Sequence, residues 1–215
     1  MTGNDDATTL KPEFFKRVDD SEDEAFYASP RLVAHIDDAA RDALTTYYST
    51  ALPAGGAILD LMSSYYSHLP KTTSYSAVVG LGMNDTELDQ NTQLTERVIH
   101  NLNRDPRLPC ATARFDACLI AVSIQYLTQP PAVLAEVARV LKQDAPCIVS
   151  YSNRCFPTKA VAAWRALDDQ DHAKLVALYF KTAGSFEPAE LNILNSPGNS
   201  MDPLYVVAAR KKRKS

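Results

Sequence analysis

The chain lacks several features that would assign it to well-known classes of protein. Its 215 residues contain no run approaching the roughly 18 apolar residues that a membrane span needs. The N-terminus, MTGNDDATTL, lacks the basic and then apolar layout of a secretory signal. The net charge of −4 is also not the basic excess expected of a nucleic-acid-binding protein. We therefore expect a cytoplasmic protein that has neither nucleic acid nor membrane as a partner.

Disulfides and metal sites are not indicated either. The four cysteines, Cys110, Cys118, Cys147 and Cys155, include no CxxC pair, and no His or Cys lies at the spacing of zinc ligands. Cys118 and Cys147 fall inside apolar runs, where a free thiol behaves as a small hydrophobic side chain. We expect buried, reduced thiols and no bound metal.

Length and charge predict one domain with two charged ends. Residues 1–24 carry an excess of Asp and Glu with little periodicity, which is typical of a flexible acidic lead-in. Residues 25–209 are long enough to bury a core without disulfides or metals. Residues 210–215 form a basic tail. Such a tail is more often a solvated, frayed end than a nuclear signal or a phosphate-binding arm, and the nuclear alternative stays open.

What the chain does contain is strands that alternate with helices. The clearest unit is Phe115 to Arg154, in which two apolar runs flank an amphipathic helix and each run is followed by polar residues. Predicted strands are Ala57–Leu61, Ser76–Leu81, Arg97–His100, Phe115–Val122, Pro146–Tyr151 and Leu204–Ala209. Apolar residues recur at helical spacing over Asp23–Tyr48, and Ser29-Pro30 is a plausible helix start there. Further predicted helices are Asp85–Leu94, capped by Asn84 or Asp85, Pro131–Leu141, Lys159–Leu167 and Asp171–Ala183. The alternation predicts an α/β fold with a parallel sheet covered on both faces.

Polar residues leave the first predicted strand at the edge of the sheet where ligands bind in such folds. Asp60 closes this strand. A carboxylate there could accept hydrogen bonds from an ammonium or hydroxyl group of a ligand, or it could cap the following backbone. Ser63 and Ser64 follow, and they could offer hydroxyl and backbone N–H groups to a carboxylate.

The second predicted strand ends in Gly80-Leu81-Gly82-Met83-Asn84. Glycine here would let a ligand approach the backbone, or it would only form a turn. Met83 offers a soft apolar surface for an aromatic ring. The amide of Asn84 could bind ribose hydroxyls or cap a helix.

The order of these parts resembles a known family. ILDLMSS, VVGLGMN, NLNRDPRLP, FDACLIAVSIQYL, EVARVLK and CIVSYSNR together look like a class I, S-adenosylmethionine-dependent methyltransferase of the small-molecule "type 11" kind. The resemblance implies a three-layer Rossmann-like sheet of about seven strands, mostly parallel with an antiparallel last strand, and an N-terminal helical cover. It implies S-adenosylmethionine as cofactor without a metal, and a small molecule as methyl acceptor. Whether the chain forms a homo-oligomer stays open.

The resemblance also assigns roles to single residues. It places the cofactor against Asp60, Met62, Ser63, Ser64, Gly82, Met83, Asn84, Asn101, Leu102, Val122 and Ser123. Tyr126 is the catalytic candidate near the transferred methyl, with a core aromatic residue as the alternative. Asn153 and Arg154 would face the substrate, although Arg154 could instead pair with the acidic N-terminal residues.

Several positions depart from the family pattern. The family usually has three glycines after the first-strand Asp, and here Met62, Ser64 and Tyr66 occupy that loop. Gly82 stands where an acidic residue usually holds the ribose, and Asn101 replaces the adenine-edge carboxylate. A catalytically inactive, methyltransferase-like binding or regulatory protein is therefore the alternative. A nicotinamide-dependent dehydrogenase is disfavoured, because the loop after the first strand has no G-x-G-x-x-G turn.

Overall fold

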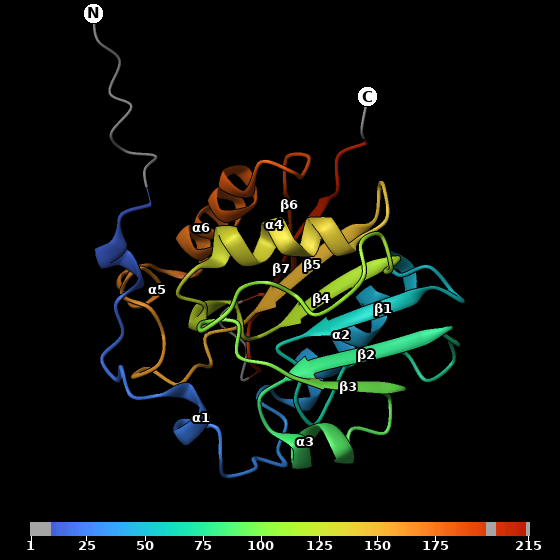
Figure 1. Cartoon of the computed structure of the whole chain (residues 1–215), viewed down its shortest axis with the longest axis horizontal. Coiled ribbons are helices and arrows are strands. Elements are labelled where there is room, and N and C mark those ends of the chain that lie inside the picture. The colour runs from blue at the N-terminus through green and yellow to red at the C-terminus, as the bar shows by residue number, and fades with distance from the viewer. Residues whose placement is uncertain (1–9, 197–200, 214–215) are drawn as a thin grey trace, which may run out of the picture.

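The computed structural model describes residues 10–196 and 201–213. In this part of the chain, seven strands form one sheet in the order β3-β2-β1-β4-β5-β7-β6 (Figure 1). The strands are β1 (Ala57–Leu61), β2 (Ala77–Gly82), β3 (Glu96–Ile99), β4 (Ala117–Ala121), β5 (Pro146–Tyr151), β6 (Glu190–Asn195) and β7 (Leu204–Arg210). The first five are mutually parallel, and β7 lies antiparallel between β5 and β6. The predicted Rossmann-like sheet with an antiparallel last strand is confirmed.

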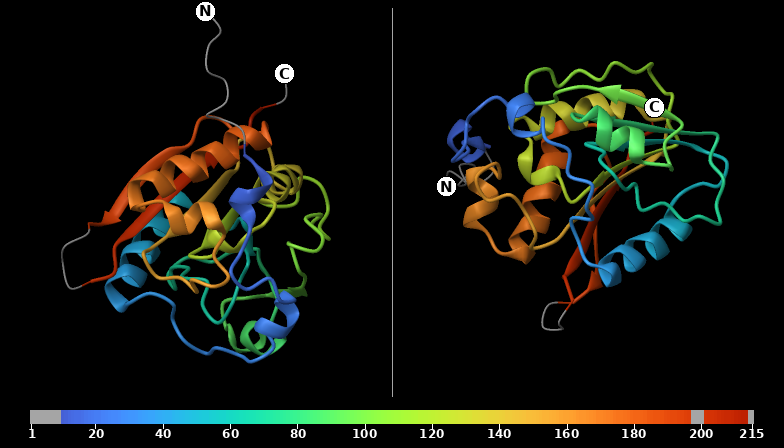
Figure 2. Two further views of the ribbon diagram at one scale, coloured as in Figure 1. Left: turned by 90° about the vertical axis from the view of Figure 1, so that its left-hand side faces the viewer. Right: turned by 90° about the horizontal axis from the view of Figure 1, so that it is seen from below.

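Helices cover both faces of this sheet (Figure 2). Helices α4 (Pro130–Val140) and α6 (Asp169–Ala183) pack on one face, and α2 (Asp38–Ala51) packs on the other. Successive side chains of a strand point to opposite faces, so β1 contributes Leu59 to the first core and Ile58 to the second. The structure is therefore the predicted three-layer arrangement.

Local capping explains where several helices begin. Helix α3 (Asp85–Gln90) starts after Asn84, whose Oδ1 accepts a hydrogen bond from the backbone N of Glu87 at 3.1 Å, which confirms the predicted cap. Helix α6 starts after Asp168, whose side chain accepts from two backbone N–H groups. It ends at Gly184, whose φ of 77° is the left-handed conformation that glycine adopts most easily. The predicted helix at 159–167 is reduced to α5 (Ala162–Ala166).

The helix expected from the spacing over Asp23–Tyr48 does not start at Ser29-Pro30, so the predicted start is wrong. The structure has a single turn, α1 (Asp23–Phe26), then an irregular stretch, and then α2. The start of α2 is decided by Asp37, which accepts from the backbone N of Ala40 at 2.8 Å and also exchanges hydrogen bonds with Asp202 near the other end of the chain. A distant residue therefore helps to set this helix boundary.

Two further features escape the pattern in the sequence. Strand β6 was not predicted, because its residues ELNILN are polar or half-exposed at the edge of the sheet. The connection from β1 to β2, residues 62–76, contains no helix. It instead forms an irregular loop over the ends of the strands, and this loop becomes part of the site.

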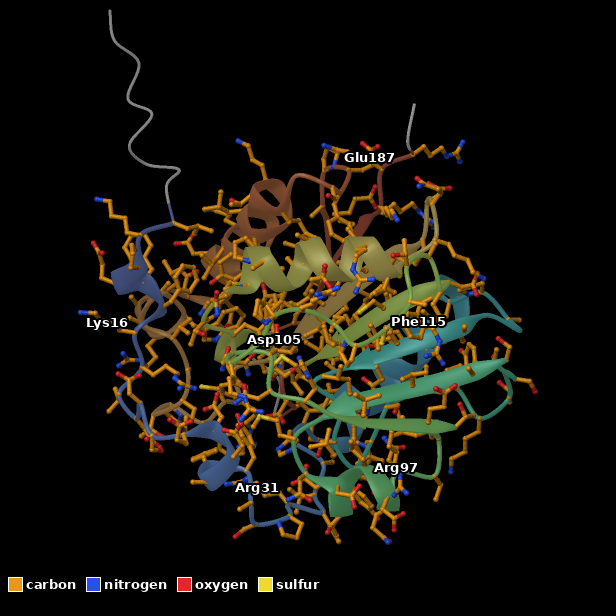
Figure 3. All side chains as sticks on the ribbon, in the orientation of Figure 1. Lys16, Arg31, Arg97, Asp105, Phe115 and Glu187 are labelled. Carbon is orange, nitrogen blue, oxygen red and sulfur yellow. The ribbon has the colours of Figure 1, made fainter. Side chains whose placement is uncertain are left out.

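The residues before α1 also contact the body of the protein. A short 3-10 helix, η2 (Pro12–Phe15), leads to Lys16, whose carbonyl oxygen accepts from the backbone N of Ala162 at 2.8 Å (Figure 3). Lys159 is fully buried and donates to the carbonyl oxygen of Ser21 at 2.7 Å. Its Nζ lies 3.3 Å from a carboxylate oxygen of Asp23. Within the described residues, no helix is long and apolar enough to cross a bilayer.

Candidate functional site

A cavity of about 240 Å³ lies at the carboxyl ends of β1, β2 and β4. The fold brings nearly all the predicted site residues to its walls: Asp60, Met62, Ser63, Ser64, Gly82, Met83, Asn84, Asn101, Leu102, Val122, Ser123, Tyr126 and Arg154. Asn153 is the exception, because its side chain is exposed and does not line the cavity. The roles of these residues toward a cofactor or substrate stay predictions.

Asp60 is the buried acid of the cavity. Its Oδ2 accepts hydrogen bonds from the hydroxyls of Ser63 and Ser67, both at 2.6 Å. Burial raises the pKa of Asp60 to about 6, although the two hydroxyls partly oppose the shift. Asp60 forms no ion pair within the described residues. At neutral pH the cavity therefore contains a buried negative charge that the protein itself does not neutralise.

The loop after β1 uses its own polar groups within the fold. The backbone N of Ser63 donates to the carbonyl oxygen of Leu81 at 2.8 Å, and its hydroxyl donates to Asp60. The hydroxyl of Ser64 donates to Oε2 of Glu87 at 2.6 Å. Both serine hydroxyls and the backbone N–H of Ser63 are thus engaged with protein atoms.

Close backbone contact explains why Gly82 occupies the end of β2. A Cβ at this position would overlap the carbonyl oxygen of Ser63, so no larger residue fits while the loop holds its place. The same loop places Met62 at a φ of 58°, in the left-handed region where residues other than glycine are strained. The close fit of this loop therefore rests on the missing Cβ of Gly82 and on the left-handed backbone of Met62.

The two asparagines of the predicted site satisfy backbone groups nearby. Besides capping α3, Asn84 donates from Nδ2 to the carbonyl oxygens of Tyr27 at 2.9 Å and Ala28 at 3.1 Å. Oδ1 of Asn101 accepts from the backbone N of Asn103 at 2.9 Å. Asn84 thus fastens an N-terminal stretch of chain to the end of β2.

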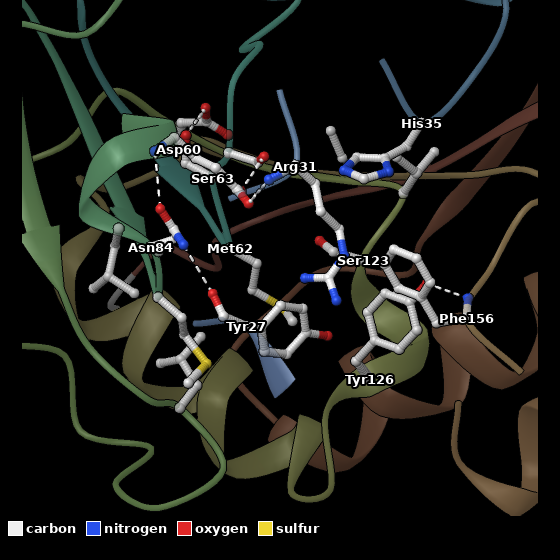
Figure 4. Close-up of a pocket in the computed structure, with 18 of the residues that line it drawn as sticks. Tyr27, Arg31, His35, Asp60, Met62, Ser63, Asn84, Ser123, Tyr126 and Phe156 are labelled. Carbon is white, nitrogen blue, oxygen red and sulfur yellow. Dashed lines mark hydrogen bonds between the residues drawn. The ribbon is translucent and has the colours of Figure 1, made fainter. Parts of the chain in front are cut away.

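That stretch, residues 23–36, is called here the N-terminal segment, and it forms a wall of the cavity (Figure 4). The sequence predicted it as part of a helical cover and assigned its side chains no role in the site. Tyr27, Arg31 and His35 come from it. The backbone N of Arg31 donates to Oε1 of Glu87 at 2.7 Å, and Glu87 is itself buried. No motif marks these residues, and their apolar spacing predicted a helix instead. Their position in the cavity wall is set by hydrogen bonds of the segment's backbone to Asn84 and Glu87.

The opposite wall is formed by residues after β4 and β5. The hydroxyl of Tyr126 accepts from the backbone N of Phe156 at 2.8 Å, and the two rings lie 5.9 Å apart. Burial raises the pKa of Tyr126 to about 12, so it keeps its proton at neutral pH. The Oγ of Ser123 is buried and has no hydrogen-bond partner among the described residues.

The core of the chain matches a known family. Residues 61–149 match the family model described as a methyltransferase domain. This segment is similar to a methyltransferase domain. The class I, type 11-like resemblance stated from the sequence is confirmed. A search of curated proteins returned no match.

Solved structures share the fold at low sequence identity. A methyltransferase in complex with the Trm112 methyltransferase activator of Haloferax volcanii is 13% identical with a TM-score of 0.62, over 83% of this chain and 92% of that one. The cyclase SpnF is 12% identical with a TM-score of 0.58, over 80% and 82%. The geranyl diphosphate C-methyltransferase of Streptomyces coelicolor, in complex with Mg²⁺, geranyl diphosphate and S-adenosyl-L-homocysteine, is 11% identical with a TM-score of 0.54, over 79% and 77%. At such identities these likenesses show the fold alone.

Two histidines, His35 and His68, line the cavity. Burial lowers the pKa of His68 to about 4, and Arg41 and His35 add to the shift. Burial also lowers the pKa of His35, against the opposing effect of Glu87. Both imidazoles are therefore neutral at pH 7. No group of three or more His, Cys, Asp or Glu side chains in the described part of the chain is arranged to hold a metal.

Arg154 lies at the rim of the cavity and is already paired. Its Nε lies 2.8 Å from Oδ1 of Asp202, and its side chain is 65% exposed. Asp202 precedes β7, so the partner is not the acidic N-terminal stretch that the sequence offered as an alternative. An exposed arginine with an internal carboxylate is a weaker anion site than a buried, unpaired one.

Proposed function

We propose that this chain is an S-adenosylmethionine-dependent methyltransferase that acts on a small-molecule acceptor. The observation that carries the proposal is the uncompensated carboxylate of Asp60 at the carboxyl edge of β1. A buried charge is costly unless an opposite charge meets it, so the cavity favours a cationic ligand. The ammonium and sulfonium groups of S-adenosylmethionine fit this requirement, and Met62, Met83 and Leu102 give apolar lining for its adenosine.

The residues of the cavity can support methyl transfer by positioning. The cofactor supplies an electrophilic methyl group, so the protein has to align the acceptor and exclude water. Tyr126 keeps its proton and can donate a hydrogen bond that orients an acceptor. His35 is neutral, lines the cavity and makes no hydrogen bond with the described residues, so we assign it as the proton acceptor where an acceptor must lose a proton.

A second candidate function is a catalytically inactive, methyltransferase-like binding or regulatory protein. The loop after β1 favours it, because the hydroxyls of Ser63 and Ser64 and the backbone N–H of Ser63 donate to Asp60, Glu87 and Leu81 rather than to a ligand. The Haloferax volcanii neighbour bound to an activator shows that this fold can carry a protein partner. This candidate predicts ligand binding without methyl transfer.

Calorimetric titration with S-adenosylmethionine and S-adenosylhomocysteine tests the proposal. We expect both compounds to bind the wild-type protein. We expect Asp60→Asn to lower the affinity for S-adenosylmethionine by about 10- to 100-fold, because a hydrogen bond to a charged group is lost. Asp116→Asn is the matched control. Asp116 lies at the amino edge of the sheet, where it accepts from the backbone N of Ala57, and it should leave binding unchanged.

The outcomes separate the two candidates. Absence of heat with either compound at millimolar concentration rules out the cofactor. Binding that Asp60→Asn does not alter shows that the cavity is not its site. Binding that depends on Asp60, together with an absence of methyl transfer to a panel of small acceptors, favours the inactive protein.

A further inference from the structure

We propose that Arg31 makes this pocket a carboxylate-binding site, an inference that rests on the proposed function. Nη1 of Arg31 is buried and has no hydrogen-bond partner among the described residues. Within residues 10–196 and 201–213, Arg31 also forms no ion pair, unlike Arg17 or Arg154. A half-buried cation with a buried, unpaired donor beside a cavity is the complement of an anionic ligand group.

The guanidinium of Arg31 is held in a fixed place by aromatic rings. Its Cζ lies 4.7 Å from the ring centre of Phe26, 5.2 Å from that of Phe156 and 5.7 Å from that of Tyr27. Nη2 donates to the carbonyl oxygen of Phe26 at 3.0 Å. Stacking and one hydrogen bond therefore orient the planar group before a ligand arrives, which lowers the entropy lost on binding.

The side chain of Arg31 lines the cavity. In Figure 4, Arg31 extends into the middle of the pocket, between Tyr27 on one side and Tyr126 and Phe156 on the other. The hydroxyl of Ser123, buried and without a partner, lies on the same cavity wall as Tyr126. Arg31 and Ser123 thus bring two unused donors to one cavity.

The hydroxyls of Ser63 and Ser64 and the guanidinium of Arg154 do not compete for this role. Ser63 and Ser64 are engaged within the loop after β1, and Arg154 is paired with Asp202 at the exposed rim. A carboxylate that enters the pocket therefore finds its strong, planar partner in the N-terminal segment. Together, Arg31 and the uncompensated Asp60 suit a ligand that carries both signs of charge.

Two sources could supply the carboxylate. One is the amino-acid end of the cofactor, and the other is an acidic acceptor with a planar ring that the surrounding aromatic side chains would hold. The chemistry at Arg31 is the same in both cases. The test is therefore designed to tell the sources apart.

The experiment titrates S-adenosylmethionine, decarboxylated S-adenosylmethionine and, on protein saturated with S-adenosylhomocysteine, benzoate. Each is titrated into the wild-type protein and into Arg31→Gln and Arg31→Lys. If the cofactor supplies the carboxylate, Arg31→Gln lowers the affinity for S-adenosylmethionine by about 10- to 100-fold and leaves the affinity for the decarboxylated form unchanged. If the acceptor supplies it, both cofactor forms bind as before and benzoate binding is lost. Arg31→Lys keeps the positive charge but not the planar guanidinium. Its affinity for the carboxylate ligand should therefore lie between those of the wild-type protein and Arg31→Gln.

Arg104→Gln is the matched control. Arg104 pairs with Glu24 on the surface and does not line the cavity, so its removal tests for long-range charge effects. Equal weakening of both cofactor forms by Arg31→Gln, or no change in any titration, overturns the carboxylate site. Absence of all cofactor binding to the wild-type protein instead rejects the proposed function, and benzoate on the cofactor-free protein then tests Arg31 by itself. Circular dichroism confirms that each variant is folded.

Discussion

The loop after β1 and the N-terminal segment line the same cavity, but they use their polar groups in opposite ways. In the loop, the hydroxyls of Ser63 and Ser64 bind carboxylates of the protein itself. In the segment, Arg31 keeps a buried donor without a partner. Polar groups that form hydrogen bonds within the protein stabilise the fold, whereas buried polar groups without a partner are available to a ligand. The comparison therefore moves the expected binding function from the loop to the segment.

The largest effect is expected from a variant that removes the contacts of Lys159 with the N-terminal segment and the residues just before it. Lys159→Met removes a fully buried cation that lies 3.3 Å from Asp23 and contacts Ser21. Loss of one partner of a buried pair leaves the other uncompensated, so the free energy of unfolding should fall by about 4 kcal/mol. Urea denaturation measures it.

Lys174→Met is the control for that variant. Lys174 pairs with Asp171, but the side chain of Lys174 is 79% exposed, and solvent screening makes such a pair weak. The control should unfold at nearly the same urea concentration as the wild-type protein. Equal losses in both variants would show that Lys159 does not anchor the segment.

The second effect concerns the buried charge of Asp60, which lies at the end of β1 next to the loop. The folded-state pKa of Asp60, about 6, lies above its usual 3.8, so folding disfavours the charged form. The contribution of Asp60 to stability is complete below pH 3.8 and is lost as the pH rises through about 6. Asp60→Asn should therefore be more stable than the wild-type protein at pH 8, by about 2 to 3 kcal/mol, with the two converging near pH 4. Urea unfolding at several pH values measures this, and a difference that does not change with pH would contradict it.

The smallest expected effect tests the close contact between the loop and β2. Gly82→Ala places a Cβ against the carbonyl oxygen of Ser63, which is backbone, so the free energy of unfolding should fall by about 2 kcal/mol. Gly80→Ala in the same strand is the control, because its Cβ meets only the flexible end of Leu94. The control should lose less stability in thermal unfolding. For the same steric reason, Gly82→Asp should not restore a ribose-binding acid of the family kind.

Much of the sheet follows from local patterns in the sequence. The apolar run of β5 and the short apolar run of β1 have the predicted bounds, because buried strands need consecutive apolar residues and end at polar ones. Asn84 caps its helix as predicted, since capping depends only on residues three apart. Most of the predicted site residues also meet at one cavity, because parallel strands bring their carboxyl ends to the same edge.

The rest was decided by contacts between residues far apart in the chain. Strand β6 forms because β7 offers it an edge, and α2 begins where Asp37 meets Asp202. The N-terminal segment has helical spacing in the sequence, yet after the single turn α1 it is irregular and lies against the pocket, where Asn84 and Glu87 bind its backbone. The sequence by itself thus determined the sheet and the edge at which a ligand would bind, through periodicity and caps. Tertiary structure alone decided which charges at that edge stay unpaired, because pairing depends on which distant groups meet.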